Sequence, residues 1–126
     1  MLRLSRQLLQ ALVYLHGEMK WLHGDIKPQN ILMQCDPPSA DGSAVDYSNA
    51  EIKLADFGLA KVMDQHNSSA VSATFMLSNA ASIVGQLKGT MWYLSPQSLK
   101  GQRLFSCDLW SACLVILEMD TGLPLE

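Results

Sequence analysis

The sequence predicts an α+β domain that is mainly helical and carries one short β-hairpin. Three observations support this fold class: leucines recur at helical spacing near the N-terminus, two β-prone runs flank a turn-rich stretch, and an apolar segment lies near the C-terminus. The 126 residues, 48% of them apolar, suffice for one modest domain. Charged residues make up 17%, against roughly 25% in an average soluble domain, so we expect a large buried surface and an additional packing partner.

The first predicted element is an amphipathic helix at the N-terminus. Its apolar face is formed by Leu4, Leu8, Leu12 and Leu15, with Leu9 and Val13 beside it. These residues recur at steps of three or four, which is the spacing of one helical face. Gly17 follows the last leucine and is expected to cap the C-terminus of the helix. The polar residues between the leucines exclude a signal peptide.

A β-hairpin is expected next. The short β-prone runs Asn30–Met33 and Glu51–Ala55 are separated by a stretch rich in Pro, Ser, Asp and Gly, which predicts an inserted surface loop. From Asp64 to Gln86 the chain is rich in Ser, Asn and Ala and has weak periodicity. We expect this part to be a flexible segment.

The most apolar run, Leu109–Met119, predicts a buried helix. It is shorter than the ~20 residues that a membrane span needs, and it follows Asp108 directly. The helix is expected to end near Thr121–Gly122, with Pro124 just beyond as a stop signal. We therefore expect no membrane span.

Charge and cysteine content narrow the function classes. The net charge is −3 and the basic residues form no block, so nucleic acid is not an expected partner. The three cysteines, at positions 35, 107 and 113, lack metal-ligand spacing and leave one thiol over if two pair. This predicts a reducing, intracellular location in the cytoplasm.

The motif His23–Asn30, HGDIKPQN, resembles the catalytic loop of eukaryotic-type protein kinases, which usually reads His-Arg-Asp-Leu-Lys-Pro-x-Asn. Phosphoryl transfer needs an acceptor that orients the attacking hydroxyl, a cation near the transferred group and a metal ligand. The resemblance implies these roles for Asp25, Lys27 and Asn30 in that order. It also implies that Lys27 and Asn30 contact the nucleotide.

Asp56-Phe57-Gly58 follows the second β-prone run, where the family places the aspartate that binds the magnesium bridging the ATP phosphates. By itself this tripeptide is more often a strand ending in a turn. The resemblance implies that Asp56 is a metal ligand together with Asn30. It also places Leu32 among the residues that bind the nucleotide.

The stretch Gly89–Gln97, GTMWYLSPQ, resembles the end of the family's activation segment, usually Gly-Thr-x-x-Tyr-x-Ala-Pro-Glu. The resemblance implies that Thr90 hydrogen-bonds towards Asp25 and Lys27 as part of the catalytic set. A threonine at position 90 and a lysine at position 27 resemble the residues that serine/threonine kinases have at these places, more than those of tyrosine kinases. The alternative interpretation of the stretch is an aromatic-rich turn that packs on a core.

Asp108-Leu109-Trp110-Ser111 is similar to the start of the family's central helix, whose aspartate bonds the backbone near the catalytic-loop histidine. This implies a structural role for Asp108. His23 and Phe57 are expected to stack on each other, with His23 a core residue that has no catalytic role.

The four motifs stand in the family's order, so the chain is identified as a member of the kinase family, similar to a portion of its C-lobe. We expect a partial kinase domain without the N-lobe and the C-terminal helices, and therefore an inactive isolated chain that needs a missing N-lobe or partner chain. The implied activity is transfer of the ATP γ-phosphate, with Mg²⁺, to a serine or threonine of a protein substrate. The implied parts are the domain 1–126, catalytic loop 23–30, Asp-Phe-Gly segment 56–58, activation segment 56–97 and central helix about 108–121.

Two other function classes stay open at this point. A pseudokinase-like fragment could present this surface to a partner without turnover. The pattern His-Gly-Asp, with Asn five residues after the aspartate, also resembles phosphotransferases that modify aminoglycosides or choline. Lys27-Pro28 and the stretch Gly89–Pro96 separate the chain from those small-molecule kinases.

Some positions depart from the family pattern. Gly24 replaces the arginine that pairs with a phosphate on the activation segment, so we expect that phosphorylation does not switch this kinase. Gln97 replaces a glutamate, and Cys113 replaces a glycine. Candidate phosphate acceptors in the expected flexible segment are Ser68, Ser69, Ser72, Thr74, Ser78 and Ser82. Such residues are also the ordinary content of flexible loops.

Overall fold

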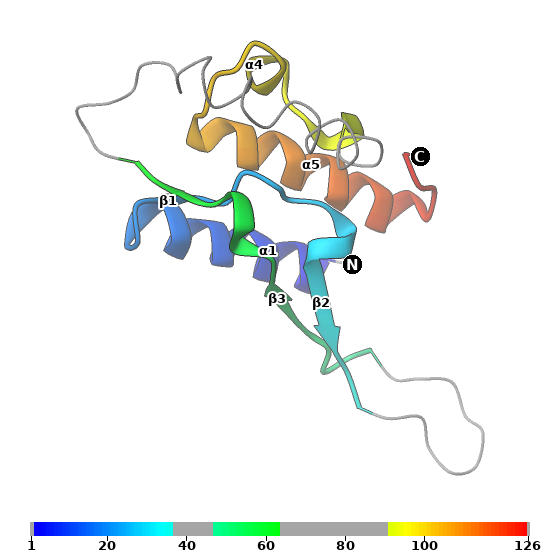
Figure 1. Ribbon diagram of the computed structural model, residues 1–126. Helices are drawn as coiled ribbons and strands as arrows, with labels where there is room; N and C mark the ends of the chain where they lie inside the picture. Colours follow the sequence, from blue (N-terminus) through cyan, green and yellow to red (C-terminus); the bar gives the residue numbers. More distant parts are fainter. Residues whose placement is uncertain (1, 37–46, 64–90, 126) are drawn as a thin grey trace.

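A computed structural model describes residues 2–36, 47–63 and 91–125 (Figure 1). The elements are α1 (Leu2–Gly17), β1 (Trp21–Leu22), β2 (Ile31–Gln34), β3 (Glu51–Leu54), β4 (Lys61–Val62), α4 (Pro96–Leu99) and α5 (Phe105–Thr121). Figure 1 shows α1 and α5 packed side by side, with the chain after β1 running between them, and the β2–β3 hairpin extending away. The predicted α+β class with one hairpin is confirmed. The expected flexible segment Asp64–Gln86, with its serines and threonine, lies outside the described residues, as does Thr90.

α1 confirms the predicted amphipathic helix, although its buried face is narrower than the apolar pattern. Leu8, Leu12 and Leu15 are buried, whereas Leu9 and Val13 are exposed. The helix ends at Gly17 as predicted, but Gly17 does not have the left-handed conformation of a glycine cap. The chain continues through a turn before it reverses at Lys20, whose φ is 55°.

The β2–β3 hairpin is antiparallel, with Ile31 opposite Leu54 and Gln34 opposite Glu51. β2 begins one residue later than predicted because Asn30 belongs to a 3₁₀ turn. The side chain of Gln7 ties the hairpin to α1: its Oε1 accepts a 2.9 Å hydrogen bond from the amide of Ile52. The helix thus fixes the strand that leads to Asp56.

α5 begins three residues before Asp108, at Phe105, and ends at Thr121. Gly122 follows with φ 68°, which confirms the predicted stop. The prediction of a buried helix holds for one face, which includes Asp108, Ala112 and Val115. The opposite face, with Leu109 and Leu117, is about half exposed. None of the described helices has the length and apolar character that crossing a bilayer requires.

A second antiparallel pair, β1 with β4, was not predicted. It places Trp21 opposite Val62 and Leu22 opposite Lys61. In the sequence, β1 directly precedes the catalytic-loop motif and β4 follows the Asp-Phe-Gly segment. The core lies between α1 and α5, and Trp21 of β1 packs against it. Its buried members are Leu8, Leu12, Leu15, Ile26, Tyr93, Ala112 and Val115.

Candidate active site

The loop His23–Asn30 is anchored to α5 by the carboxylate of Asp108. One oxygen, Oδ2, accepts a 2.8 Å hydrogen bond from the amide of His23, and Oδ1 accepts a 2.9 Å bond from the amide of Gly24. Asp108 is buried, so these amides are the donors that compensate for removing its charge from water. The expected contact between Asp108 and the backbone near His23 is present in the structure.

His16 on α1 also contacts this carboxylate, which the sequence analysis missed. Its Nε2 lies 2.8 Å from Asp108 Oδ2, and its ring stacks on Phe105 with centroids 4.5 Å apart. A signal was available: His16 follows Leu12 by four residues and therefore lies on the buried face of the helix. A polar residue at such a position indicates a buried partner.

His23 is fully buried and hydrogen-bonded at both ring nitrogens. Nδ1 accepts from the amide of Asp25 at 3.3 Å, so Nε2 carries the proton and donates to the carbonyl of Ala55 at 3.1 Å. The ring centroid lies 4.8 Å from that of Phe57, so the predicted contact is present, but the ring planes are tilted by 51° and the predicted stacking is wrong. His23 therefore links the catalytic-loop motif to the Asp-Phe-Gly segment.

Asp25 has one carboxylate oxygen held and one without a partner. Oδ2 lies 2.8 Å from Lys27 Nζ and accepts a 3.0 Å hydrogen bond from Asn30 Nδ2, which also donates to the Asp25 carbonyl at 2.8 Å. Asp25 is 9% exposed, and its Oδ1 has no hydrogen-bond partner among the residues that the structure describes. A buried carboxylate oxygen without a donor is costly, which points to an external hydrogen-bond donor at this position.

Asn30 and Asp56 lie at the same end of the hairpin. The amide of Ala55 donates a 2.9 Å hydrogen bond to the carbonyl of Asn30. This bond brings the end of the catalytic-loop motif next to the start of the Asp-Phe-Gly segment. Asp56 is exposed and has the left-handed conformation, with φ 58° and ψ 74°. Its Oδ1 accepts a hydrogen bond from the amide of Gly58 at 3.2 Å. A non-glycine residue in this conformation is strained, and such strain is typical of functional sites.

The oxygen atoms of these two side chains suit magnesium. The Asn30 side chain uses Nδ2 for its hydrogen bonds to Asp25, which leaves its Oδ1 as an oxygen donor. Magnesium prefers such hard oxygen ligands and is held by one or two carboxylates together with substrate phosphates. No cluster of at least three His, Cys, Asp or Glu side chains suited to a metal occurs in the described part of the chain. The donor set therefore fits a metal delivered with a nucleotide rather than a metal held by the protein alone.

Leu32 and Thr90 complete the residues that the sequence analysis selected. The Leu32 side chain, on β2 opposite Lys53, is 58% exposed and offers an apolar surface near the hairpin end that carries Asn30. Thr90 lies outside the described residues, so its expected contact with Asp25 and Lys27 stays a prediction. The structure thus brings Asp25, Lys27 and Asn30 into contact, with Asp56 at the adjoining strand end.

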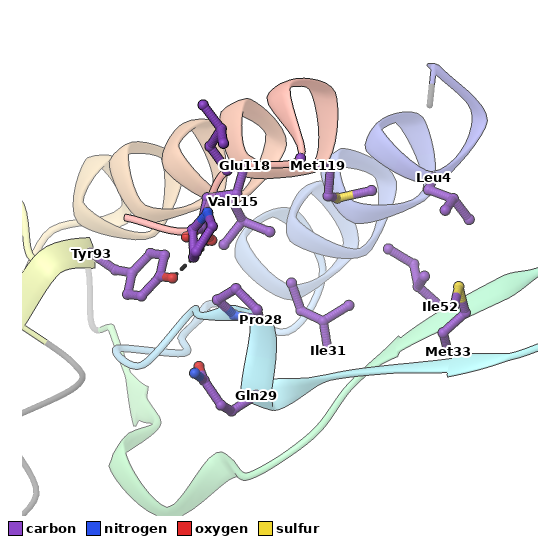
Figure 2. A pocket seen from close by; sticks show the side chains of 13 residues that line it. Leu4, Pro28, Gln29, Ile31, Met33, Ile52, Tyr93, Val115, Glu118 and Met119 are labelled. Atoms are coloured by element: carbon purple, nitrogen blue, oxygen red, sulfur yellow. Dashed lines mark hydrogen bonds between the residues drawn. The ribbon is translucent and has the colours of Figure 1, made fainter. Parts of the chain in front are cut away.

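A mainly apolar groove of about 540 Å³ borders the loop at Pro28 and Gln29 (Figure 2). Figure 2 shows Ile31 and Val115 pointing into it from β2 and α5. At one end the hydroxyl of Tyr93 donates a 2.8 Å hydrogen bond to Glu118 Oε2. Tyr93 is buried in the core, whereas Trp92 beside it is exposed. Gln97, by contrast, lies exposed on α4.

Comparison with known proteins agrees with this geometry. The chain is 32% identical over 118 residues to mitogen-activated protein kinase kinase 2 of Arabidopsis thaliana, an alignment that covers 93% of this chain and 25% of the relative. It is 35% identical over 121 residues to dual specificity mitogen-activated protein kinase kinase 1 of Dictyostelium discoideum, covering 95% of this chain and 14% of the relative. It is 32% identical over 124 residues to a serine/threonine-protein kinase STE7 homolog of Candida albicans, covering 98% and 16%.

The chain thus spans a quarter or less of the length of these three relatives. The family model of the protein kinase domain matches residues 1–125, which includes all four motifs and both long helices. On this match, the chain belongs to the protein kinase family.

Proposed function

We propose that this chain carries the catalytic loop and the metal-binding segment of a protein serine/threonine kinase. The observation that carries the proposal is the Asp25 carboxylate, which is fixed through Oδ2 while the buried Oδ1 has no partner in the described residues. A hydroxyl group that donates to Oδ1 would satisfy this oxygen. The same hydrogen bond would orient the hydroxyl oxygen for attack on a phosphoryl group.

Lys27 and Asn30 orient Asp25 in this proposal. Their contacts with Oδ2, at 2.8 and 3.0 Å, prevent the carboxylate from rotating and keep Oδ1 directed away from them. The Lys27 ammonium also places a positive charge beside the position that the transferred phosphoryl group would take. By family resemblance, Thr90 hydrogen-bonds towards these two residues and belongs to the same catalytic set.

ATP and Mg²⁺ are the proposed cofactors. Asn30 and Asp56 would hold the metal, which neutralises charge on the phosphates when it is bound. Leu32, with its exposed side chain, would provide an apolar contact for the base of the nucleotide. Phosphate-bound magnesium needs few protein ligands, which agrees with the small donor set at this strand end.

The proposed boundaries are those of a partial kinase domain, with the catalytic loop at 23–30, the activation segment at 56–97 and the central helix about 108–121. The proposed substrate is a protein with a serine or threonine. One relative is named a dual specificity kinase, so phosphotyrosine is an outcome that the test must measure. All three cysteines are free, and we propose a reducing, intracellular location on this basis.

Two carboxylate variants of the full-length protein test the proposal, with Asp120→Asn as the control because Asp120 is exposed on α5. Asp25→Asn should abolish transfer of labelled phosphate to protein while nucleotide binding is retained. Asp56→Asn should weaken magnesium-dependent nucleotide binding, measured by calorimetry. Substantial turnover by Asp25→Asn would contradict the role of Oδ1. Transfer to choline or an aminoglycoside, with none to protein, would favour a small-molecule phosphotransferase.

A further inference from the structure

Gly24 lies directly before Asp25, and an arginine from a distant loop occupies the space beside it. A Cβ atom built on Gly24 would lie 2.5 Å from Nη1 of Arg103 and 3.2 Å from the carbonyl oxygen of Leu59. Arg103 belongs to the connection between α4 and α5 and is partly buried. The guanidinium therefore takes the place that a side chain at position 24 would need.

The backbone of Gly24 needs an external restraint. Its φ is +80°, a conformation that glycine adopts readily, but glycine also has more conformational freedom than any other residue. Asp108 restrains this turn by accepting hydrogen bonds from the amides of His23 and Gly24. These bonds fix the amides. The α-carbon of Gly24 has no side chain, so it needs a neighbouring group to pack on it.

We propose that Arg103 is a positioning residue whose guanidinium packs on Gly24 and holds the turn that presents the Asp25 carboxylate. The packing itself is independent of the proposed function, whereas its effect on catalysis depends on it. In the described part of the chain, the guanidinium forms neither a hydrogen bond nor an ion pair. Its contribution to the turn is therefore packing.

Arginine is suited to this role by its shape and hydration. The guanidinium is planar and more weakly hydrated than an ammonium group, so one face can lie on a backbone α-carbon at small desolvation cost. The aliphatic stem can pack on apolar surface while the charged end stays near solvent. A lysine at position 103 would place a compact and strongly hydrated charge there instead.

Hydrogen exchange of the backbone amides tests the packing without any enzyme assay. The test compares Arg103→Ala with Lys100→Ala, which removes the same charge from an exposed position in the same connection. Arg103→Ala should speed exchange at the amides of His23, Gly24 and Asp25 about tenfold, with α1 and α5 unchanged. Lys100→Ala should leave these three amides as they are. Unchanged exchange at the turn in Arg103→Ala, or an equal rise in both helices, would overturn the proposal.

A double-variant cycle tests the pairing of the two residues. Gly24→Ala places a Cβ against Nη1 and should displace the guanidinium, in addition to straining the backbone at φ +80°. In the Arg103→Ala background the backbone strain and the close approach to the Leu59 carbonyl are left, but the contact with the guanidinium is gone, so Gly24→Ala should have a smaller effect on exchange at Asp25. An equal effect in both backgrounds would show that the residues are not coupled. If Arg103→Ala does not fold, Arg103→Met is used, and the same outcomes decide.

Kinetics on the full-length protein test the consequence for catalysis. Arg103→Ala should lower kcat by about tenfold to a hundredfold with the KM for ATP unchanged, because a displaced carboxylate affects orientation rather than nucleotide binding. Arg103→Lys should recover part of the loss. A wild-type kcat in Arg103→Ala would overturn the positioning role. If the wild-type protein transfers no phosphate, the proposed function fails, and hydrogen exchange still decides whether Arg103 holds the turn.

Discussion

The carboxylate of Asp108 accepts a 2.8 Å hydrogen bond from the amide of His23, a residue 85 positions earlier in the chain. His16 of α1 contacts the same carboxylate oxygen. A single buried side chain of α5 thus fixes the turn before Asp25 and connects it to both long helices. The geometry of the proposed catalytic loop depends on this one carboxylate.

Replacing Asp108 with Asn should loosen the loop and destabilise the protein. The amide group of Asn turns one acceptor into a donor, which would face the N–H groups that the carboxylate now accepts from. We expect the free energy of unfolding to fall by about 1–3 kcal/mol, measured by denaturant titration. Asp120→Asn, on the exposed face of the same helix, should change it by less than about 0.5 kcal/mol. Equal effects of the two variants would contradict this account of Asp108.

Removing the ring of His16 should also destabilise the protein. His16→Ala loses a hydrogen bond to a charged group and the stacking on Phe105, so we expect a loss of about 1.5–3 kcal/mol. His16→Gln keeps a donor and should lose less. Denaturant titration of both variants measures the difference. A larger loss with Gln than with Ala would argue against the hydrogen bond as the main contribution.

Two neighbouring residues of α1 test which helix face forms the core. Leu12 is 1% exposed and Val13 is 72% exposed, although both belong to the apolar pattern of the sequence. Leu12→Ala leaves a cavity and should lower the free energy of unfolding by about 2–5 kcal/mol. Val13→Ala should change it by less than about 0.6 kcal/mol, because Ala is also a better helix former. Comparable losses of the free energy of unfolding in both variants would show that Leu12 and Val13 are equally buried, which would contradict this core.

The 126-residue chain by itself should bind magnesium and ATP weakly. Among its described residues, the proposed nucleotide contacts Asn30, Asp56 and Leu32 would enclose only one side of a nucleotide. Isothermal titration calorimetry on the monomeric chain, with ATP added in the presence of Mg²⁺, measures the affinity. Micromolar binding would contradict the expectation and show that other residues enclose the phosphates.

Activity of the full-length protein should not depend on phosphorylation between Asp64 and Gln86. The reason is Gly24, which has no side chain to pair with a phosphate. Turnover is compared before and after phosphatase treatment, and in a variant with the five candidate serines and the one candidate threonine changed to Ala. A large loss of turnover in either comparison would show that a phosphate does switch this kinase.

Local patterns predicted most of the fold, because the elements concerned are long or repetitive. The leucine spacing of α1 and the stop at Gly122 are properties of consecutive residues and were confirmed. The start of α5 was placed too late because its N-cap residue, Leu104, has no side-chain cap to mark it. The strands β1 and β4 are two residues each, and their pairing depends on chain segments far apart in sequence.

In the candidate site, too, contacts within one motif could be predicted from the sequence, whereas contacts between distant segments could not. Asp25, Lys27 and Asn30 lie within one motif, so their proximity followed from the sequence, and the structure adds which atoms meet. His16 could have been found as a polar residue on a buried helix face. Arg103 could not, because its approach to Gly24 depends on the path of the connection between α4 and α5. Such a contact has no periodicity in the sequence.

The bond between Asp108 and His23 also has a consequence for synthesis on the ribosome. The 85 residues that follow His23, up to and including Asp108, must be translated before the carboxylate can reach the loop. At about 5–20 residues per second, this takes roughly 4–17 s, during which the amides of His23 and Gly24 lack their native acceptor. The proposed catalytic loop therefore acquires its native shape only when α5 has left the exit tunnel.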